Sequence, residues 1–219
     1  MLVSSASGIL FALSAELPLL PLAPPAPTFG THDIIDYYVR YGEVLRTNQL
    51  VGCFGAMFFL VFLAGLRVHL QRLQCTPSLL TLVAITAGVV AATMSLTANA
   101  ASLSIVVNAG QVQETAAIEL LHDFANATDV LTSLPLAIVV GCTSAILVHR
   151  KHASRWIGLA GFPVAALLTF RVLALGGGPA LPFPPLYPAW FEALAISMVV
   201  RQHPAIDGGS GQRYNQPDG

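Results

Sequence analysis

The sequence predicts an all-α membrane protein, a polytopic bundle of six transmembrane helices with both termini in the cytoplasm. Three observations support this prediction. Of the 219 residues, 55% are hydrophobic and only 10% are charged, whereas a soluble domain has about 25% charged residues. Apolar windows close to the roughly 20 residues that a helix needs to cross a bilayer recur along the chain. Basic residues also gather in alternate connections between these windows.

The six apolar windows form one predicted transmembrane domain, residues 1–203. They cover residues 3–22, 49–66, 78–107, 130–148, 156–175 and 186–200. The first window resembles a cleaved signal peptide in part, but the first basic residue is Arg40, so the positive region that precedes the apolar core of such a peptide is missing. We therefore expect a retained helix. Residues 204–219 are Gly-rich and polar, and are expected to form a disordered cytoplasmic tail.

Residues 32–46, between the first two windows, have the periodicity of an amphipathic helix. Ile34, Tyr38, Tyr41 and Leu45 share one face of that helix. Charged residues occupy the opposite face, and the tyrosines suit the headgroup layer of a bilayer. The pattern predicts a short outer interfacial helix, either a surface anchor, which we favour, or a lid over a cavity.

The orientation follows from the positive-inside rule, by which the basic short connections stay in the cytoplasm. The basic residues follow the second, fourth and sixth windows: Arg67 and Arg72, then Arg150, Lys151 and Arg155, then Arg201. All three groups lie on one side only if the number of spans is even and the first window is a real helix. The expected location is therefore the cytoplasmic cell membrane.

Composition and motifs exclude several classes of function. The net charge is −1, so the chain lacks the basic surface that nucleic-acid binding needs. Cys53, Cys75 and Cys142 stand apart without the spacing of a metal site, and small core residues are favoured over a disulfide or a metal ligand set. The sequence contains no GxSxG, no Walker loop and no dinucleotide fingerprint. No catalytic residue, metal or cofactor is predicted, and the expected partner is the lipid bilayer.

Small residues recur four positions apart in three of the windows. They are Ala84, Gly88 and Ala92 in the third, Gly52 and Ala56 in the second, and Gly141 and Ala145 in the fourth. Such spacing lets helix backbones approach closely in lipid. It predicts close packing, either within one chain or between the subunits of a homo-oligomer.

Ionisable side chains inside hydrocarbon are costly, so each one marks a candidate site. Glu16, Arg171 and Glu192 fall within the windows. At about 1.5 Å per helical residue, Arg171 lies roughly 24 Å from Arg155, in the outer part of a core about 30 Å thick. Glu192 lies nearer the middle. Because the last two helices should be antiparallel neighbours, an Arg171–Glu192 ion pair is plausible, either as part of a pathway or as a pair that fixes helix register, which we favour.

A second polar group stands at the outer boundary of the fourth window. His122, Asn126 and Asp129 share one helical face, with Asp123 to one side. These residue types suit a metal or proton site. The spacing lacks the specificity of a HExxH motif, so a polar, water-exposed extension of the helix is favoured.

The stretch LHDFANATDVLTSLPLAIVVGCTSAILVHRKHASRWIGLAGF combines an acidic outer helix, a "PL" near the start of the span, a basic turn and "RWIGLAG" opening the next helix. In this layout it resembles a broad group of uncharacterised bacterial membrane proteins of actinobacterial type, of the domain-of-unknown-function kind. The resemblance implies the six-helix arrangement and brings no activity with it.

Three functions remain open. The first is transport or permeation of a small solute or ion through a polar site in the outer half of the membrane that involves Arg171, Glu192 and Glu16, with Asp129 as a further candidate. The second is a structural or regulatory membrane protein whose polar residues only fix packing. The third, a membrane-embedded metal enzyme, is the least favoured, since it would need His122, Asp123 and Asp129 to converge with Asp33 or Asp36.

Overall fold

The protein is an all-α helical bundle. The computed structural model describes residues 2–16, 31–73, 79–108, 115–149, 155–174 and 186–200, and contains no strand within them. The helices are α1 (Leu2–Glu16), α2 (Thr31–Leu73), α3 (Leu79–Asn108), α4 (Thr115–Leu131), α5 (Ser133–Val148), α6 (Arg155–Leu173) and α7 (Leu186–Val200). The predicted tail, residues 204–219, and the end of the first window, residues 17–22, lie outside the described residues.

Helices α4 and α5 form one continuous rod with a local break at Thr132. The break has a cause in the sequence, because Pro135 has no N–H to donate to the carbonyl of Leu131 and its ring crowds that carbonyl. The chain keeps its course across the break, since the Thr132 N–H donates to the Thr128 carbonyl at 3.0 Å and the Leu136 N–H donates to the Thr132 carbonyl at 3.3 Å. Counting this rod once, the described residues contain six helical segments, and each of the six predicted windows contains part of one.

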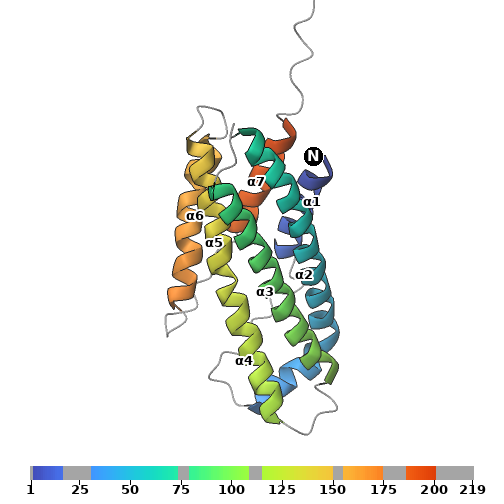
Figure 1. The fold of residues 1–219 in the computed structure, drawn as a ribbon. Helices are drawn as coiled ribbons and strands as arrows, with labels where there is room; N and C mark the ends of the chain where they lie inside the picture. Colours follow the sequence, from blue (N-terminus) through green and yellow to red (C-terminus); the bar gives the residue numbers. More distant parts are fainter. Residues whose placement is uncertain are drawn as a thin grey trace, which may run out of the picture.

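The segments run alternately up and down, so that α1 begins and α7 ends at the same end of the bundle (Figure 1). We call this the termini end and the opposite one the far end. Arg72 lies in the last turn of α2 and Arg155 begins α6, so both lie at the termini end. Their position agrees with the predicted grouping of basic residues on one side. Arg150, Lys151 and Arg201 fall outside the described residues.

Four of the segments are long and apolar enough to cross a membrane: Ile34–Leu73, Leu79–Asn108, Ala116–Val148 and Arg155–Leu173. Two shorter apolar helices, Leu2–Ala15 and Leu186–Val199, accompany them. Large apolar side chains such as Phe54, Leu82 and Phe170 are exposed on the outside of the bundle. A soluble protein rarely exposes so much apolar surface, and the chain is therefore a membrane protein.

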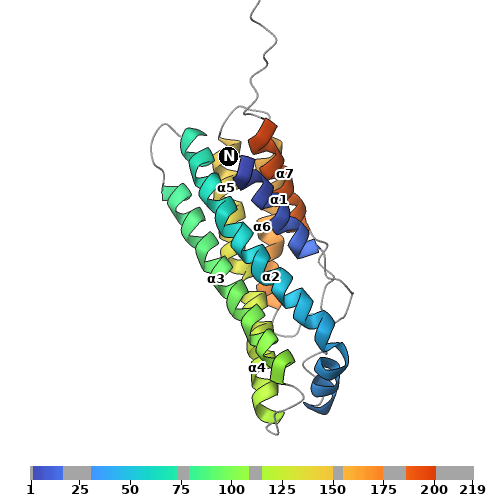
Figure 2. The same ribbon diagram turned by 90° about the vertical axis from the view of Figure 1, so that its right-hand side faces the viewer.

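The predicted interfacial segment, residues 32–46, is helical and is the beginning of α2 rather than a separate helix. Its apolar face packs on α3 and α4 in a small second core of Ile34, Tyr38, Leu45, Ile105 and Ile118. Figures 1 and 2 show this part of the bundle at the far end, beside α4. The part of α2 from Ile34 to Leu73, 40 residues that include an apolar window, is about 60 Å long, twice the thickness of a hydrocarbon core. Packing on α4 stabilises the helical turns formed by residues 32–46, which we call the added turns of α2.

The main core fills the half of the bundle nearer the termini end. It contains Phe62, Leu66, Leu70, Leu194 and Met198, all fully buried, together with side chains from α3, α5 and α6. Gly88 shows why small residues recur, because a Cβ atom there would lie 2.5 Å from the Leu63 Cδ1 atom. The small-residue face of α3 is thus used for packing against α2 within one chain. Homo-oligomerisation stays a prediction.

Candidate functional site

A cavity of about 280 Å³ lies where all six segments meet. It lies about midway along the bundle, because its lining includes the middle of α2, of α3 and of the α4–α5 rod, and it is at this level that α1 and α6 end and α7 begins. The residues that line it are Phe11, Ser14, Ala15, Gly52, Gly55, Ala56, Phe59, Ala91, Ala92, Ser95, Asn99, Asp129, Thr132, Ser133, Leu136, Leu168, Arg171 and Tyr187. Polar side chains make up nearly half of this set.

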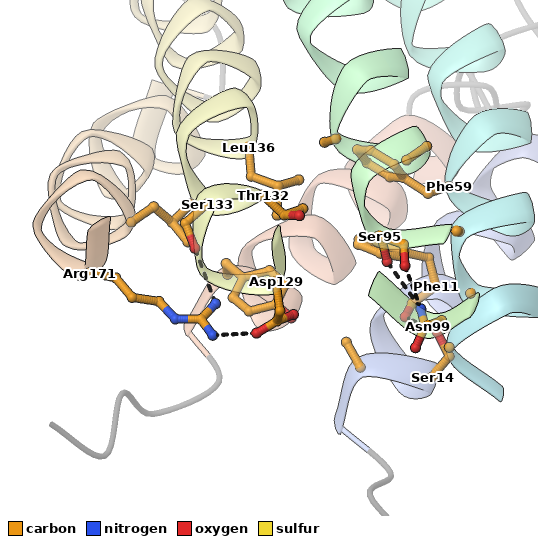
Figure 3. Close-up of a pocket in the computed structure, with 18 residues that line it drawn as sticks. Phe11, Ser14, Phe59, Ser95, Asn99, Asp129, Thr132, Ser133, Leu136 and Arg171 are labelled. Carbon is orange, nitrogen blue, oxygen red and sulfur yellow. Dashed lines mark hydrogen bonds and ion pairs between the residues drawn. The ribbon is translucent and has the colours of Figure 1, made fainter. Parts of the chain in front are cut away.

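One wall of the cavity holds an ion pair. The Arg171 Nη2 atom lies 2.7 Å from the Asp129 Oδ2 atom, and the Nη1 atom donates a hydrogen bond to the Ser133 hydroxyl at 3.1 Å (Figure 3). The Arg171 side chain is 34% exposed and the Asp129 side chain 63%. Both charged groups are therefore accessible to a molecule in the cavity. Because their charges are opposite, this wall is electrically neutral overall.

Local sequence explains this geometry. Asp129 and Ser133 are four residues apart on the α4–α5 rod, so their side chains lie one above the other on the same face. Helix α6 packs mainly on α5, and Arg171, in the last turn of α6, reaches both partners from that side. A guanidinium group suits this arrangement because its separate N–H groups can donate to two acceptors at once.

The opposite wall is polar but uncharged. The Asn99 Nδ2 atom donates to the Ser95 carbonyl at 2.8 Å and lies 3.4 Å from the Ser95 hydroxyl (Figure 3). Helix α2 approaches this side chain through Gly52, where an added Cβ would lie 2.7 Å from the Asn99 Oδ1 atom. Ser14, from α1, completes this wall and donates to the Phe11 carbonyl at 2.6 Å.

Aromatic rings close the cavity toward the termini end. Phe11 and Phe59 line it, with ring centroids 4.5 Å apart. Phe191 packs edge-on against both, at 5.5 Å from each. In Figure 3 the labelled rings lie beside and above the polar side chains, on the side of the main core. The cavity is thus bounded on that side by rings from α1, α2 and α7.

The Arg171–Glu192 pair expected from the sequence is replaced by Arg171–Asp129. The reason lies in the position of α7, which packs more on α1 than on α6. Its Trp190 indole N–H donates to the Ile157 carbonyl of α6 at 2.9 Å, about 21 Å along α6 from Arg171. Glu192 follows two residues later, roughly 200° around the helix, and so points away from α6. Within the described residues Glu192 neither lines the cavity nor takes part in an ion pair. Glu16 ends α1, and its side chain is outside the described part.

The other predicted polar residues divide into two kinds. His122 is 1% exposed, with its Nδ1 atom 3.0 Å from the Tyr38 hydroxyl and its Nε2 atom 2.9 Å from the Asn126 amide nitrogen. With the Asn126 amide nitrogen facing the ring, the His122 Nε2 atom accepts a hydrogen bond from it. The proton of the neutral ring is then on Nδ1, which donates to the Tyr38 hydroxyl oxygen. Asp123 is exposed. These residues therefore do not form one polar face toward water, because His122 is turned inward against α2.

The convergence that a metal enzyme would need is not seen in the described part of the chain, where no three His, Cys, Asp or Glu side chains are close enough to hold a metal ion. Asp129 turns to Arg171, and His122 turns to Tyr38. Cys53 and Cys142 are free, partly buried thiols, and Cys75 lies outside the described residues.

Ser133, Asn99 and Ser95 were not identified as site residues from the sequence. A signal was available, because Asp129–Ser133 and Ser95–Asn99 both have the four-residue spacing that places polar groups on one helical face. That signal alone does not say which faces meet.

Comparison with protein-family models, with curated proteins and with solved structures finds no match for this chain. The fold and the cavity therefore define the class by themselves: a helical-bundle membrane protein with a polar, charge-paired cavity at the junction of its helices.

Proposed function

We propose that the chain is a multi-pass integral protein of the bacterial cytoplasmic membrane, and that it binds a small polar solute in the cavity and passes it across the bilayer. The observation behind this proposal is that every helical segment contributes to one cavity with a charged pair on its wall. A membrane protein needs no such space for packing alone, since interiors are otherwise filled to crystal-like density.

Orientation adds to the proposal. The positive-inside rule assigns the termini end, with Arg72 and Arg155, to the cytoplasm. For a bilayer that surrounds α1, α6 and α7, the cavity then lies in the outer half, because α1 and α6 end and α7 begins there. The aromatic rings separate it from the cytoplasmic half. In this arrangement α1 and α7 also cross the membrane. The 15 described residues of each extend about 22 Å, most of a hydrocarbon core about 30 Å thick.

A second candidate is a structural or regulatory membrane protein. One observation favours it, namely that Asp129 and Arg171 satisfy each other without any ligand. On this alternative the pair only holds α4 to α6, and the cavity contains water or lipid.

Uptake into proteoliposomes distinguishes the two candidates. Radiolabelled glycerol, urea, glycine, choline and lactate are presented to vesicles that contain the wild-type protein, to vesicles that contain Ser95→Phe, and to protein-free vesicles. Ser95 lines the cavity, so the bulky ring should fill it and reduce uptake at least ten-fold. The matched control is Thr93→Phe, on the exposed face of α3 two residues away.

Transport predicts that at least one solute enters faster with the wild-type and Thr93→Phe proteins than with Ser95→Phe, and that circular dichroism and gel filtration find all three equally folded. If no solute enters faster than in protein-free vesicles, or if Ser95→Phe transports as well as Thr93→Phe does, the structural alternative holds.

A further inference from the structure

We infer that the ligand of the cavity is a small zwitterion, a molecule that carries one carboxylate and one ammonium group. The inference rests on the proposed solute-binding function and adds the substrate class. It starts from the charges on the cavity wall, which are one guanidinium and one carboxylate at 2.7 Å.

Charge balance selects the class. A singly charged anion that bound Arg171 would compete with Asp129 and leave that carboxylate without its partner. A singly charged cation that bound Asp129 would likewise leave the Arg171 guanidinium without its partner. Unpaired charge in a protein interior or near hydrocarbon is costly. A zwitterion exchanges one ion pair for two, so both wall charges keep a partner and the site stays neutral.

Geometry and size agree with this class. The Arg171 Nη1 atom is already held by Ser133, so the guanidinium keeps its position when Asp129 turns toward a ligand ammonium. Phe11, Phe59 and Tyr187 line the same cavity, and aromatic faces attract ammonium groups, including methylated ones. About 280 Å³ falls just below the roughly 300–1,000 Å³ of sites for drug-sized ligands, so the ligand is small.

Equilibrium binding to the purified full-length protein in detergent tests the inference. The probes are L-alanine, glycine betaine and two matched isosteres of glycine betaine. One isostere is 3,3-dimethylbutyrate, which keeps the carboxylate and replaces the charged nitrogen by carbon; the other is choline, which keeps the nitrogen and replaces the carboxylate by a hydroxymethyl group. At least one zwitterion should bind ten-fold or more tightly than either isostere, as measured by calorimetry.

The wall charges are then changed one at a time. Arg171→Gln and Asp129→Asn should each weaken zwitterion binding at least ten-fold, and they should shift selectivity in opposite directions. Arg171→Gln should favour choline over 3,3-dimethylbutyrate, and Asp129→Asn should favour the reverse. A merely structural pair would not produce this switch. The control is Asp123→Asn, an exposed carboxylate elsewhere on α4, which should bind like the wild type.

Several outcomes would overturn the inference: neither zwitterion binds, an isostere binds as tightly as the tighter-binding zwitterion, or both single variants keep the wild-type selectivity. Different outcomes test the proposed function. Uptake of glycerol, urea or lactate through the cavity without zwitterion binding would leave the function standing and remove this inference. Zwitterion binding without uptake of any solute would keep the ligand class and remove the transport step.

Discussion

Two polar sites lie seven residues apart on the same helix and have opposite surroundings. His122 faces α2 and is fully enclosed, with each ring nitrogen in contact with a polar partner. Asp129 faces α6, is 63% exposed and lines a cavity. Both residues are of types that carry chemistry elsewhere. What separates them is the space around them, since a ligand can reach Asp129 but not His122.

The enclosed surroundings of His122 suit a stabilising role, and the open surroundings of Asp129 suit the ligand binding proposed above. His122, Tyr38 and Asn126 form what we call the enclosed cluster. It joins the added turns of α2 to α4 through the Tyr38–His122 contact, next to the small second core. The Asp129–Arg171 pair is partly exposed and lines the cavity, where a polar ligand can take the place of either partner. Substitutions at the two sites should therefore move different measurements.

The largest effect on stability is expected for His122→Ala. The change leaves the Tyr38 hydroxyl and the Asn126 amide without the ring and opens a small cavity, so the free energy of unfolding should fall by about 2–4 kcal/mol. Chemical unfolding in mixed micelles measures it. Ligand binding to the folded protein should not change. Asp123→Ala, at the exposed neighbour, should stay within about 0.5 kcal/mol of the wild type.

A His122→Ala protein as stable as Asp123→Ala would show that the enclosed cluster does not hold the far end together. A His122→Ala protein that stays folded but loses ligand binding would erase the distinction between the two sites.

A smaller effect is expected for Tyr38→Phe, which keeps the ring and removes only the hydroxyl that contacts His122. The loss should be about 1 kcal/mol, the net contribution of one hydrogen bond. Tyr37→Phe is the matched control, because its ring packs beside Tyr38 and no hydrogen bond of its hydroxyl is found among the described residues. Equal unfolding free energies for the two variants would contradict the assigned role of the Tyr38 hydroxyl.

The sequence predicted the helical bundle well, because hydropathy windows report directly on which segments suit lipid. The same windows divided α2 into an interfacial helix and a span, since they measure polarity, whereas the backbone stays helical wherever a neighbour such as α4 covers one face. The small residues of α3 were also correctly taken as packing positions, as the contact of Gly88 with Leu63 shows.

The candidate site was predicted only in part. Depth along a helix follows from counting residues, and it predicted Arg171 and Asp129 near the outer boundary. The structure shows that these two side chains lie at one level, 2.7 Å apart. The partner of Arg171 depended on which helix packs beside α6 and on the rotation of α7, and Trp190 decides that rotation through its bond to Ile157. Neither property can be read from one chain without its tertiary contacts. Asn99 was missed for the same reason.

The central claim, that the cavity is a solute site reached from the side opposite the termini, is tested most directly by thiol labelling. In a background with Cys53, Cys75 and Cys142 replaced by alanine, Ser95→Cys should react from that side with a membrane-impermeant methanethiosulfonate. Glycine betaine or L-alanine should slow the reaction at least five-fold. Thr93→Cys, which faces lipid at nearly the same depth, should react slowly and without protection, because a thiolate does not form in hydrocarbon. Equal rates at the two positions, or no protection at Ser95→Cys, would contradict the claim.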